Sequence, residues 1–324
     1  MKIRIRDAFF GLMLGLLVVA AAGIGFPQTA SAAAIRPGFA ASSLAGNDDG
    51  STGLVNVGAT FNFFGTDYTQ LYVNNNGNVT FGAALPTYTP FNLSTTGRVI
   101  IAPFFADVDT RKGNVVKYGT GTVDGHPAFG VNWPGVGCYN NNTSVLNYFQ
   151  VVLIDRSDIA PKDFDIEFNY NQIQWETGTA SGGNSACQGG SSVRIGYSNG
   201  AADSFELFGS GIPGSFLDSN LATGLILHSL NSPQLGRYIF AVRGGLPPQI
   251  LTVTKVGAGT VASTPAGIDC GSTCTAPFAS GTVVTLTATP ATGSTFAGWS
   301  GDPDCTDGSV TMTAATSCTA TFTL

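Results

Sequence analysis

Charged side chains are scarce in this chain of 324 residues. Only 10% of the residues are Asp, Glu, Lys or Arg, with 14 basic and 20 acidic side chains and a formal net charge of −6. Nucleic acids and anionic membranes are bound through clustered Lys and Arg, which displace counterions or attract lipid headgroups. No such cluster is visible in the sequence, so we expect neither partner.

Histidine is rarer still, and the motifs of common enzyme classes are missing. The two histidines are His126, in a predicted turn, and His228, in an apolar stretch. A serine triad would need one of them, yet there is no G-x-S-x-G nucleophile elbow. Motifs for a zinc hydrolase (H-E-x-x-H) or for a nucleotide (G-x-G-x-x-G, P-loop) are also missing. The remaining enzymatic option is a carbohydrate-active enzyme that uses paired carboxylates. Its candidates are Asp107, Asp109, Asp165 and Glu167.

Two of these carboxylates lie in a strand-like segment. Asp165 and Glu167 alternate with Phe164, Ile166 and Phe168. Because successive side chains of a strand point to opposite faces, we expect both carboxylates on the solvated face of a strand. We therefore predict that the protein is not an enzyme.

Long apolar runs are missing as well, apart from one at the start. Lys2, Arg4 and Arg6 precede an apolar run over residues 8–26, and Ala30-Ser31-Ala32 supplies the small residues that signal peptidase recognises. We predict a secretory signal peptide at residues 1–32. Later apolar runs are only as long as a strand, so we expect no membrane span in the mature chain. The predicted location is extracellular, and a partner at the cell surface could retain the protein there.

The remaining composition favours strands joined by turns. The chain has 43 glycines, and short β-branched or aromatic runs alternate with turn residues. No long window shows the 3.6-residue apolar period of an amphipathic helix. The stretch Gly-Gly-Leu-Pro-Pro-Gln at residues 244–249 has the composition of a linker. We therefore predict an all-β protein with a domain at 33–245, a linker at 246–249 and a second domain at 250–324.

The most informative motif spans residues 71–109. Strand-forming residues flank Asn74-Asn75-Asn76-Gly77, which predicts a hairpin, and an apolar run at 98–105 leads into Ala106-Asp107-Val108-Asp109. Further segments follow in order: NYFQVVLI at 147–154, FNY and IQW within 168–175, VRIGYS at 193–198 and GRYIF at 236–240. This series resembles a nidogen-like (NIDO) domain. The resemblance implies a β-sandwich-like fold and a role in cell–matrix adhesion.

Residues 250–324 are a different kind of sequence. Short Thr- and Val-rich runs are separated by Gly and Pro, with GAGTV at 257–261, FAGWSG at 296–301 and a final TATF at 319–322. This segment resembles the bacterial repeat domain that is related to internalin B-repeats. The predicted architecture is therefore a β-sandwich-like nidogen-type domain followed by a small, disulfide-stapled all-β repeat domain.

Six cysteines in an exported chain predict three disulfides. The domain boundary separates one pair of cysteines from the other four. We expect the pairs Cys138–Cys187, Cys270–Cys274 and Cys305–Cys318. A zinc site made of the last four cysteines is the alternative, but it would need a reducing compartment and its spacing lacks the usual paired C-x-x-C.

Asp107 and Asp109 are candidate calcium ligands. Two carboxylates two residues apart at a strand end, with the Thr110 hydroxyl and nearby carbonyls, could bind Ca²⁺. The alternative is that they cap the following turn and pair with Arg111 or Lys112, because no D-x-D-x-D-G loop accompanies them. We expect no other cofactor.

These features predict a secreted, non-catalytic binding protein. The nidogen-like resemblance implies contact with an extracellular matrix or cell-surface protein or polymer. Polar loops at 140–144 and 179–191, tied together by the expected Cys138–Cys187 bridge, are a candidate surface for this contact. Two alternatives remain open: a self-assembling structural component of a biofilm or surface layer, and the carbohydrate-active enzyme.

Overall fold

The computed structural model describes residues 33–324, except for residues 96, 202, 272 and 273. The expected signal peptide lies outside these residues. In the described part of the chain, the regular elements are β-strands and short 3₁₀ helices, which confirms the all-β prediction. No helix among the described residues has the length and apolar character needed to cross a membrane.

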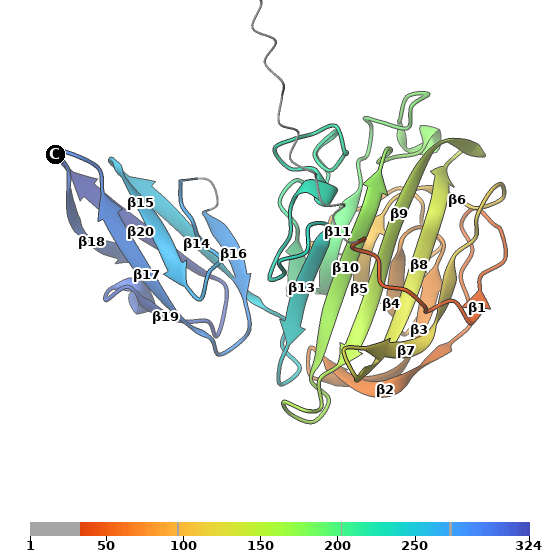
Figure 1. Cartoon of the computed structure of the whole chain (residues 1–324), viewed down its shortest axis with the longest axis horizontal. Coiled ribbons are helices and arrows are strands. Elements are labelled where there is room, and N and C mark those ends of the chain that lie inside the picture. The colour runs from red at the N-terminus through yellow and green to blue at the C-terminus, as the bar shows by residue number, and fades with distance from the viewer. Residues whose placement is uncertain (1–32, 96, 202, 272–273) are drawn as a thin grey trace, which may run out of the picture. The chain divides into compact units, whose positions relative to one another are not determined.

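The nidogen-like region consists of two antiparallel sheets packed face to face (Figure 1). The first sheet has the order β1-β7-β8-β9-β10-β13, with β6 paired to β8. Its strands are β1 (Ser42–Ser43), β6 (Val108–Asp109), β7 (Lys117–Val123), β8 (His126–Cys138), β9 (Asn142–Asp155), β10 (Phe164–Ile173) and β13 (Arg237–Val242).

The second sheet has the order β12-β11-β5-β4-β3-β2. Its strands are β2 (Val55–Phe63), β3 (Thr66–Asn74), β4 (Asn78–Phe81), β5 (Val99–Phe105), β11 (Arg194–Asn199) and β12 (Ser204–Glu206). The connections contain the 3₁₀ helices η1 (Leu93–Thr95), η2 (Thr179–Ser181) and η3 (Leu225–Leu227).

Aromatic side chains from both sheets fill the space between them. Phe104 of β5 packs against Phe149 of β9 with ring centroids 5.0 Å apart, and Trp133 of β8 stacks on Phe149 at 4.8 Å. Phe61 of β2 meets Phe164 of β10 at 4.8 Å. All five are fully buried, because alternation along each strand directs one set of side chains inward. This is the β-sandwich-like core that the resemblance implied.

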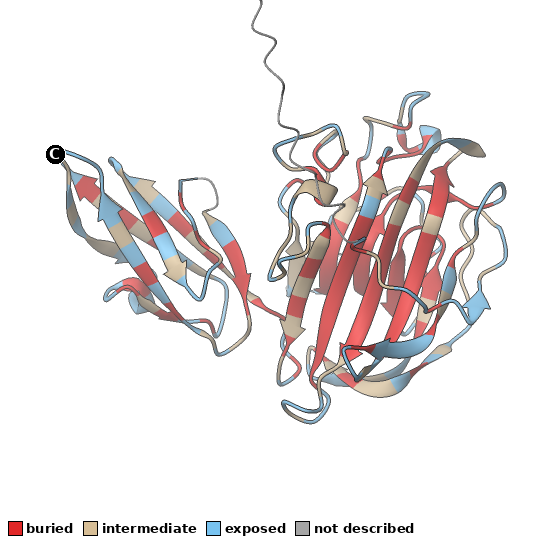
Figure 2. Ribbon diagram, in the orientation of Figure 1, coloured by how far each residue is buried: buried red, intermediate tan, exposed pale blue. Residues whose placement is uncertain are grey.

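The outward face of the first sheet is buried too, because the segment before β1 crosses it (Figure 1). Figure 2 shows β10 buried along most of its length, and β9 is buried over its second half, from Phe149 to Ile154. Phe39 of the crossing segment joins Val152 and Ile154 of β9 in a small apolar cluster. Asp165 and Glu167 lie in β10 and are 7% and 0% exposed. The expectation of a solvated face was therefore wrong: the N-terminal segment covers Glu167, and Arg156 and Arg243 hold Asp165.

An ion pair attaches the crossing segment to β10. Arg36 donates from Nε and Nη2 to the two carboxylate oxygens of Glu167 at 2.6 and 2.8 Å. Arg237 of β13 places its Nε 3.4 Å from the same carboxylate. The backbone N–H of Arg36 donates to Gln150 Oε1 at 3.1 Å. The buried charge of Glu167 is thus met by two guanidinium groups.

Residues 249–324 form a second all-β domain with its own core. One sheet has the order β16-β14-β20-β18 and the other β15-β17-β19; β14 and β20 run parallel. The elements are β14 (Gln249–Val256), β15 (Gly259–Thr264), β16 (Thr275–Phe278), β17 (Val283–Pro290), β18 (Thr295–Gly301), η4 (Pro303–Cys305), β19 (Ser309–Thr311) and β20 (Thr316–Thr323). As expected, the disulfides here are Cys270–Cys274 and Cys305–Cys318.

Candidate functional site

The turn between β3 and β4 is buried although it contains three successive asparagines. The predicted hairpin is present, with Tyr72 opposite Thr80. Asn74, Asn75 and Asn76 are at most 1% exposed. A buried amide is costly unless it is hydrogen-bonded. The side-chain amides of these asparagines form hydrogen bonds with the neighbouring loops.

Asn75 connects two loops that are distant in sequence. Its Nδ2 donates to the carbonyl oxygens of Asp48 and Val108, both at 2.5 Å, and its Oδ1 accepts from Thr110 Oγ1 at 2.7 Å. Its own carbonyl accepts a hydrogen bond from Trp133 Nε1 at 2.9 Å. One buried residue therefore joins the loop before β2 and the segment after β5 through its side chain, and the core through its backbone carbonyl.

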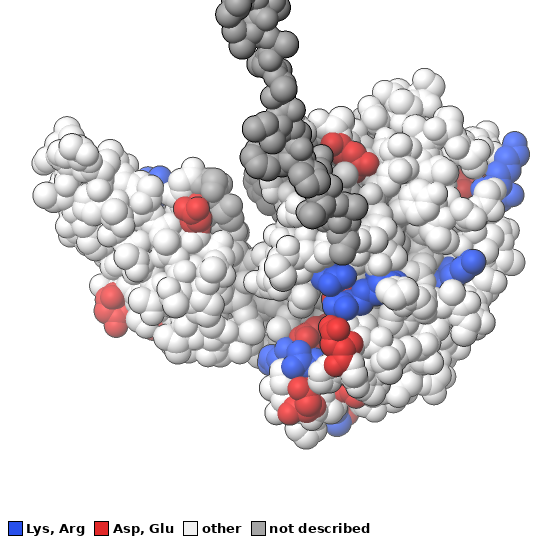
Figure 3. Space-filling view, in the orientation of Figure 1, with Lys and Arg blue, Asp and Glu red and all other residues white. Residues whose placement is uncertain are grey.

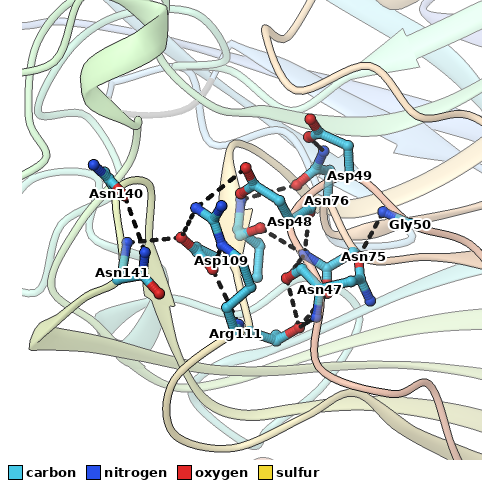
Figure 4. A network of polar contacts seen from close by, with 12 residues as sticks. Asn47, Asp48, Asp49, Gly50, Asn75, Asn76, Asp109, Arg111, Asn140 and Asn141 are labelled. Carbon is cyan, nitrogen blue, oxygen red and sulfur yellow. Dashed lines mark hydrogen bonds and ion pairs between the residues drawn. The ribbon is translucent and has the colours of Figure 1, made fainter.

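Asn76 fixes the neighbouring acidic residue. Its Nδ2 donates to Asp49 Oδ1 at 2.8 Å, and its Oδ1 accepts from the Val108 N–H at 3.0 Å. In the same loop, Asn47 Oδ1 accepts from the Gly50 N–H at 2.5 Å and closes a tight turn. Figure 4 shows Asp48 and Asp49 beside Asn75 and Asn76 as a result.

Three carboxylates converge at this place. One oxygen each from Asp48, Asp49 and Asp107 lies within 4.8 Å of the others. Asp107 is 1% exposed, and its Oδ2 is buried with no hydrogen-bond partner among the described residues; the same holds for Asp48 Oδ1. Burial, followed by the charges of the neighbouring aspartates, raises the pKa of Asp107 to about 7, and burial raises that of Asp48 to about 6.

The carboxylate of Asp109 is hydrogen-bonded to Arg111 and Asn141 and does not belong to this group of three. Arg111 donates from Nε and Nη2 to its two oxygens at 2.9 and 2.5 Å, and the Asn141 N–H donates to Oδ2 at 2.7 Å. Burial opposes ionisation of this carboxyl, but the hydrogen bonds prevail and lower its pKa. Arg111 Nη2 also lies 3.2 Å from Asp48 Oδ2 (Figure 4). The structure thus separates the expected pair: Asp107 joins Asp48 and Asp49, whereas Asp109 pairs with Arg111.

Sequence reasoning did not identify Asp48 and Asp49. They come from Asn47-Asp48-Asp49-Gly50, an acidic turn that is remote from Asp107 in the chain. The signal that could have found them is two adjacent carboxylates between an Asn and a Gly that favour a tight turn. Their closeness to Asp107 depends on Asn75, whose hydrogen bonds no sequence pattern reveals.

A disulfide-linked pair of loops borders the acidic cluster. Cys138 at the end of β8 is bonded to Cys187 in the connection after β10. In that connection, Gly178 packs against Asp107 so closely that an added Cβ would lie 2.1 Å from Asp107 Oδ2. The Tyr139 N–H donates to the Asp107 carbonyl at 3.1 Å. The cluster and the polar loops therefore occupy the same end of the sandwich.

Charges elsewhere form no patch of one sign on the face drawn in Figure 3, where acidic and basic groups are few and intermixed. Asp165, on the covered side of the first sheet, is held by Arg156 at 2.9 Å and Arg243 at 2.6 Å. This arrangement is an ion-pair network between neighbouring strands and loops.

Comparison with known proteins assigns both parts of the chain. Residues 250–324 match the divergent InlB B-repeat domain, and residues 69–244 match the nidogen-like domain. Human alpha-tectorin is 34% identical over 191 residues, which cover 51% of this chain and 9% of alpha-tectorin. Nidogen of Drosophila melanogaster is 30% identical over 132 residues, which cover 33% of this chain and 10% of that nidogen.

The matched regions are thus about a tenth of the length of these relatives. No solved structure matches the chain. The nidogen-like match alone covers more than half of the sequence. The chain therefore belongs to the nidogen-like domain family.

Proposed function

We propose that this is a secreted, non-catalytic protein that binds an extracellular matrix or cell-surface component through its nidogen-like domain. The main support is its similarity to alpha-tectorin and nidogen, which are extracellular matrix proteins. Export is supported by the three disulfides, since such bonds persist in oxidising compartments.

The surroundings of the candidate carboxylates support a non-catalytic role. A glycosidase needs two carboxyl groups that both reach the sugar. Glu167 is fully buried beneath Arg36, and Asp165 is held between Arg156 and Arg243. The other two candidates, Asp107 and Asp109, are each only 1% exposed. Neither pair is placed to act on a bound glycan.

The disulfide-linked loops are the surface we propose for binding. The expected loop at 140–144 is shorter in the structure, because β9 already begins at Asn142. Thr143 at the start of β9 and Ser185 in the connection after β10 are exposed, and Asn142 Nδ2 donates to the Ser185 carbonyl at 3.2 Å. With the Cys138–Cys187 bond, this contact holds the loops in one arrangement before a partner arrives. A preorganised surface loses less conformational entropy on binding.

Arginine substitutions in the full-length protein test this surface. Thr143→Arg with Ser185→Arg should reduce capture of the matrix component at least tenfold, because two exposed polar contacts become bulky charges. Thr120→Arg with Thr122→Arg is the matched control, since both residues are exposed in β7 and remote from the loops. Capture is measured on immobilised protein exposed to the matrix and envelope fraction of the producing cells.

Three results would contradict the proposal in different ways. Equal loss in the loop variant and the control would remove the loops as the binding surface. Glycan turnover by the wild-type protein would refute the non-catalytic role. Growth of particles with protein concentration in light scattering, without any added partner, would favour self-assembly.

A further inference from the structure

The acidic cluster has an unbalanced charge. Asp48, Asp49 and Asp107 form this cluster and Asp109 lies next to it; among the described residues, Arg111 pairs with Asp109 and with one oxygen of Asp48. Asp107 Oδ2 and Asp48 Oδ1 remain buried without a hydrogen-bond partner among the described residues. An ionised carboxylate in such a position is costly unless something compensates its charge.

We propose that Asp48, Asp49 and Asp107 form a calcium-binding site. The ligands that the structure provides are one carboxylate oxygen each from Asp48, Asp49 and Asp107, and Asn76 fixes the position of the Asp49 carboxylate. The site differs from the pair expected from the sequence, because Asp109 is occupied by Arg111. It also stands independently of the proposed adhesive function, since ion binding can be measured without a partner.

The donor set selects a hard divalent cation. All three ligands offer carboxylate oxygen, and neither histidine nor cysteine belongs to the group, which disfavours zinc and the softer transition metals. Calcium–oxygen distances of about 2.3–2.6 Å place oxygens on opposite sides of the ion about 4.6–5.2 Å apart. One oxygen from each of the three carboxylates lies within 4.8 Å of the others, a separation compatible with a shared calcium ion. Three carboxylates supply part of the six to eight oxygens that calcium takes, and water can supply the rest.

Calcium at this place would join three segments. Asp48 and Asp49 come from the loop before β2, Asp107 from the segment after β5, and Gly178 packs on Asp107 from the connection after β10. The ion would therefore hold these three segments together at the end of the sandwich that carries the disulfide-linked loops.

Thermal unfolding of the full-length protein, passed through EDTA, tests the site. With a dissociation constant of about 0.1–1 mM, typical of extracellular modules, 10 mM Ca²⁺ should raise the melting temperature by about 3–10 °C over ionic-strength-matched NaCl. Mg²⁺ should give a smaller rise because it demands a tighter octahedral shell. Isothermal titration calorimetry should give one Ca²⁺ per chain.

The diagnostic variants are Asp107→Asn and Asp48→Asn. Each should abolish the calcium-dependent rise, and Asp107→Asn should leave the melting temperature in EDTA unchanged or higher, because it removes a buried charge without a partner. Asp155→Asn is the matched control: it makes the same change at the far end of β9, where Asp155 Oδ1 accepts from the Ser157 N–H at 2.9 Å. It should keep the full calcium response.

Gly178→Ala provides a variant that leaves every carboxylate in place. The glycine has φ −95°, which alanine adopts freely, so its effect must come from the contact with Asp107. We expect a weaker calcium response. The proposal is overturned if the wild-type protein shows no rise with Ca²⁺, if Mg²⁺ gives an equal rise, or if Asp107→Asn keeps the response.

Discussion

At the scale of single residues, Asp107 illustrates how a carboxyl group acts on stability when nothing neutralises it. Burial first, and then Asp48, Asp49 and Asp109, raise its pKa to about 7, while Arg111 acts in the opposite direction. The unfolded chain titrates this group at about 3.9. Between these two values the folded protein binds more protons than the unfolded one, so its contribution to stability falls as the pH rises.

Because the contribution of Asp107 to stability falls as the pH rises, the calcium-free protein should be less stable at higher pH. Without calcium, the stabilisation associated with protonated Asp107 is complete below about pH 4 and is lost as the pH rises through 7. From pH 5 to pH 8 the free energy of unfolding in EDTA should therefore fall by on the order of 2 kcal/mol relative to Asp107→Asn. Urea denaturation of both proteins at several pH values measures the difference. Parallel pH profiles for the two proteins would contradict the prediction.

At the scale of an element, the segment of residues 34–41 behaves as part of the first sheet although it forms no strand there. Its anchor is Arg36, whose guanidinium meets the buried carboxylate of Glu167. Removing one member of a buried ion pair leaves the other charge uncompensated and typically costs about 3–5 kcal/mol.

We therefore predict that Arg36→Met destabilises the nidogen-like domain by about 3 kcal/mol, with Arg237 retaining part of the interaction. Arg36→Met combined with Glu167→Met should recover only part of that loss, because it removes the buried charge but leaves Arg237 and Asn169 without their carboxylate partner. Chemical denaturation of the wild type, the single variant and the double variant measures the change in the free energy of unfolding for each variant. A double variant less stable than Arg36→Met would contradict this and show that Glu167 stabilises the domain chiefly through Arg237 and Asn169.

The same segment shows which parts of the structure the sequence could predict. Strands and the hairpin at residues 71–81 follow from local alternation and turn residues, and they are present. The burial of Glu167 and of Asn75 depends on segments that are distant in the sequence, so alternation indicated the wrong environment for Glu167. For the candidate site, the sequence identified Asp107 but paired it with its neighbour Asp109. Asp48 was missed because its approach to Asp107 is a tertiary contact.

At the scale of the whole molecule, the two matched domains have separate hydrophobic cores. One cluster of buried residues draws its members from residues 57–242, and another draws only on residues 251–322. Each disulfide also lies within one of these regions. Stability should therefore be divided between two cooperative units.

Calorimetry of the full-length protein is expected to resolve two unfolding transitions. The small C-terminal domain has a limited core and depends more on its two disulfides, so reduction should lower its transition more than that of the larger domain. Calcium should raise only the transition of the nidogen-like domain, because all three proposed ligands lie there. Residues 33–245 expressed alone should reproduce that transition and its calcium shift. If calorimetry shows a single transition whose melting temperature rises with calcium, the two domains unfold as one unit. If calcium raises only the melting temperature of the C-terminal transition, the ion binds outside the cluster of Asp48, Asp49 and Asp107.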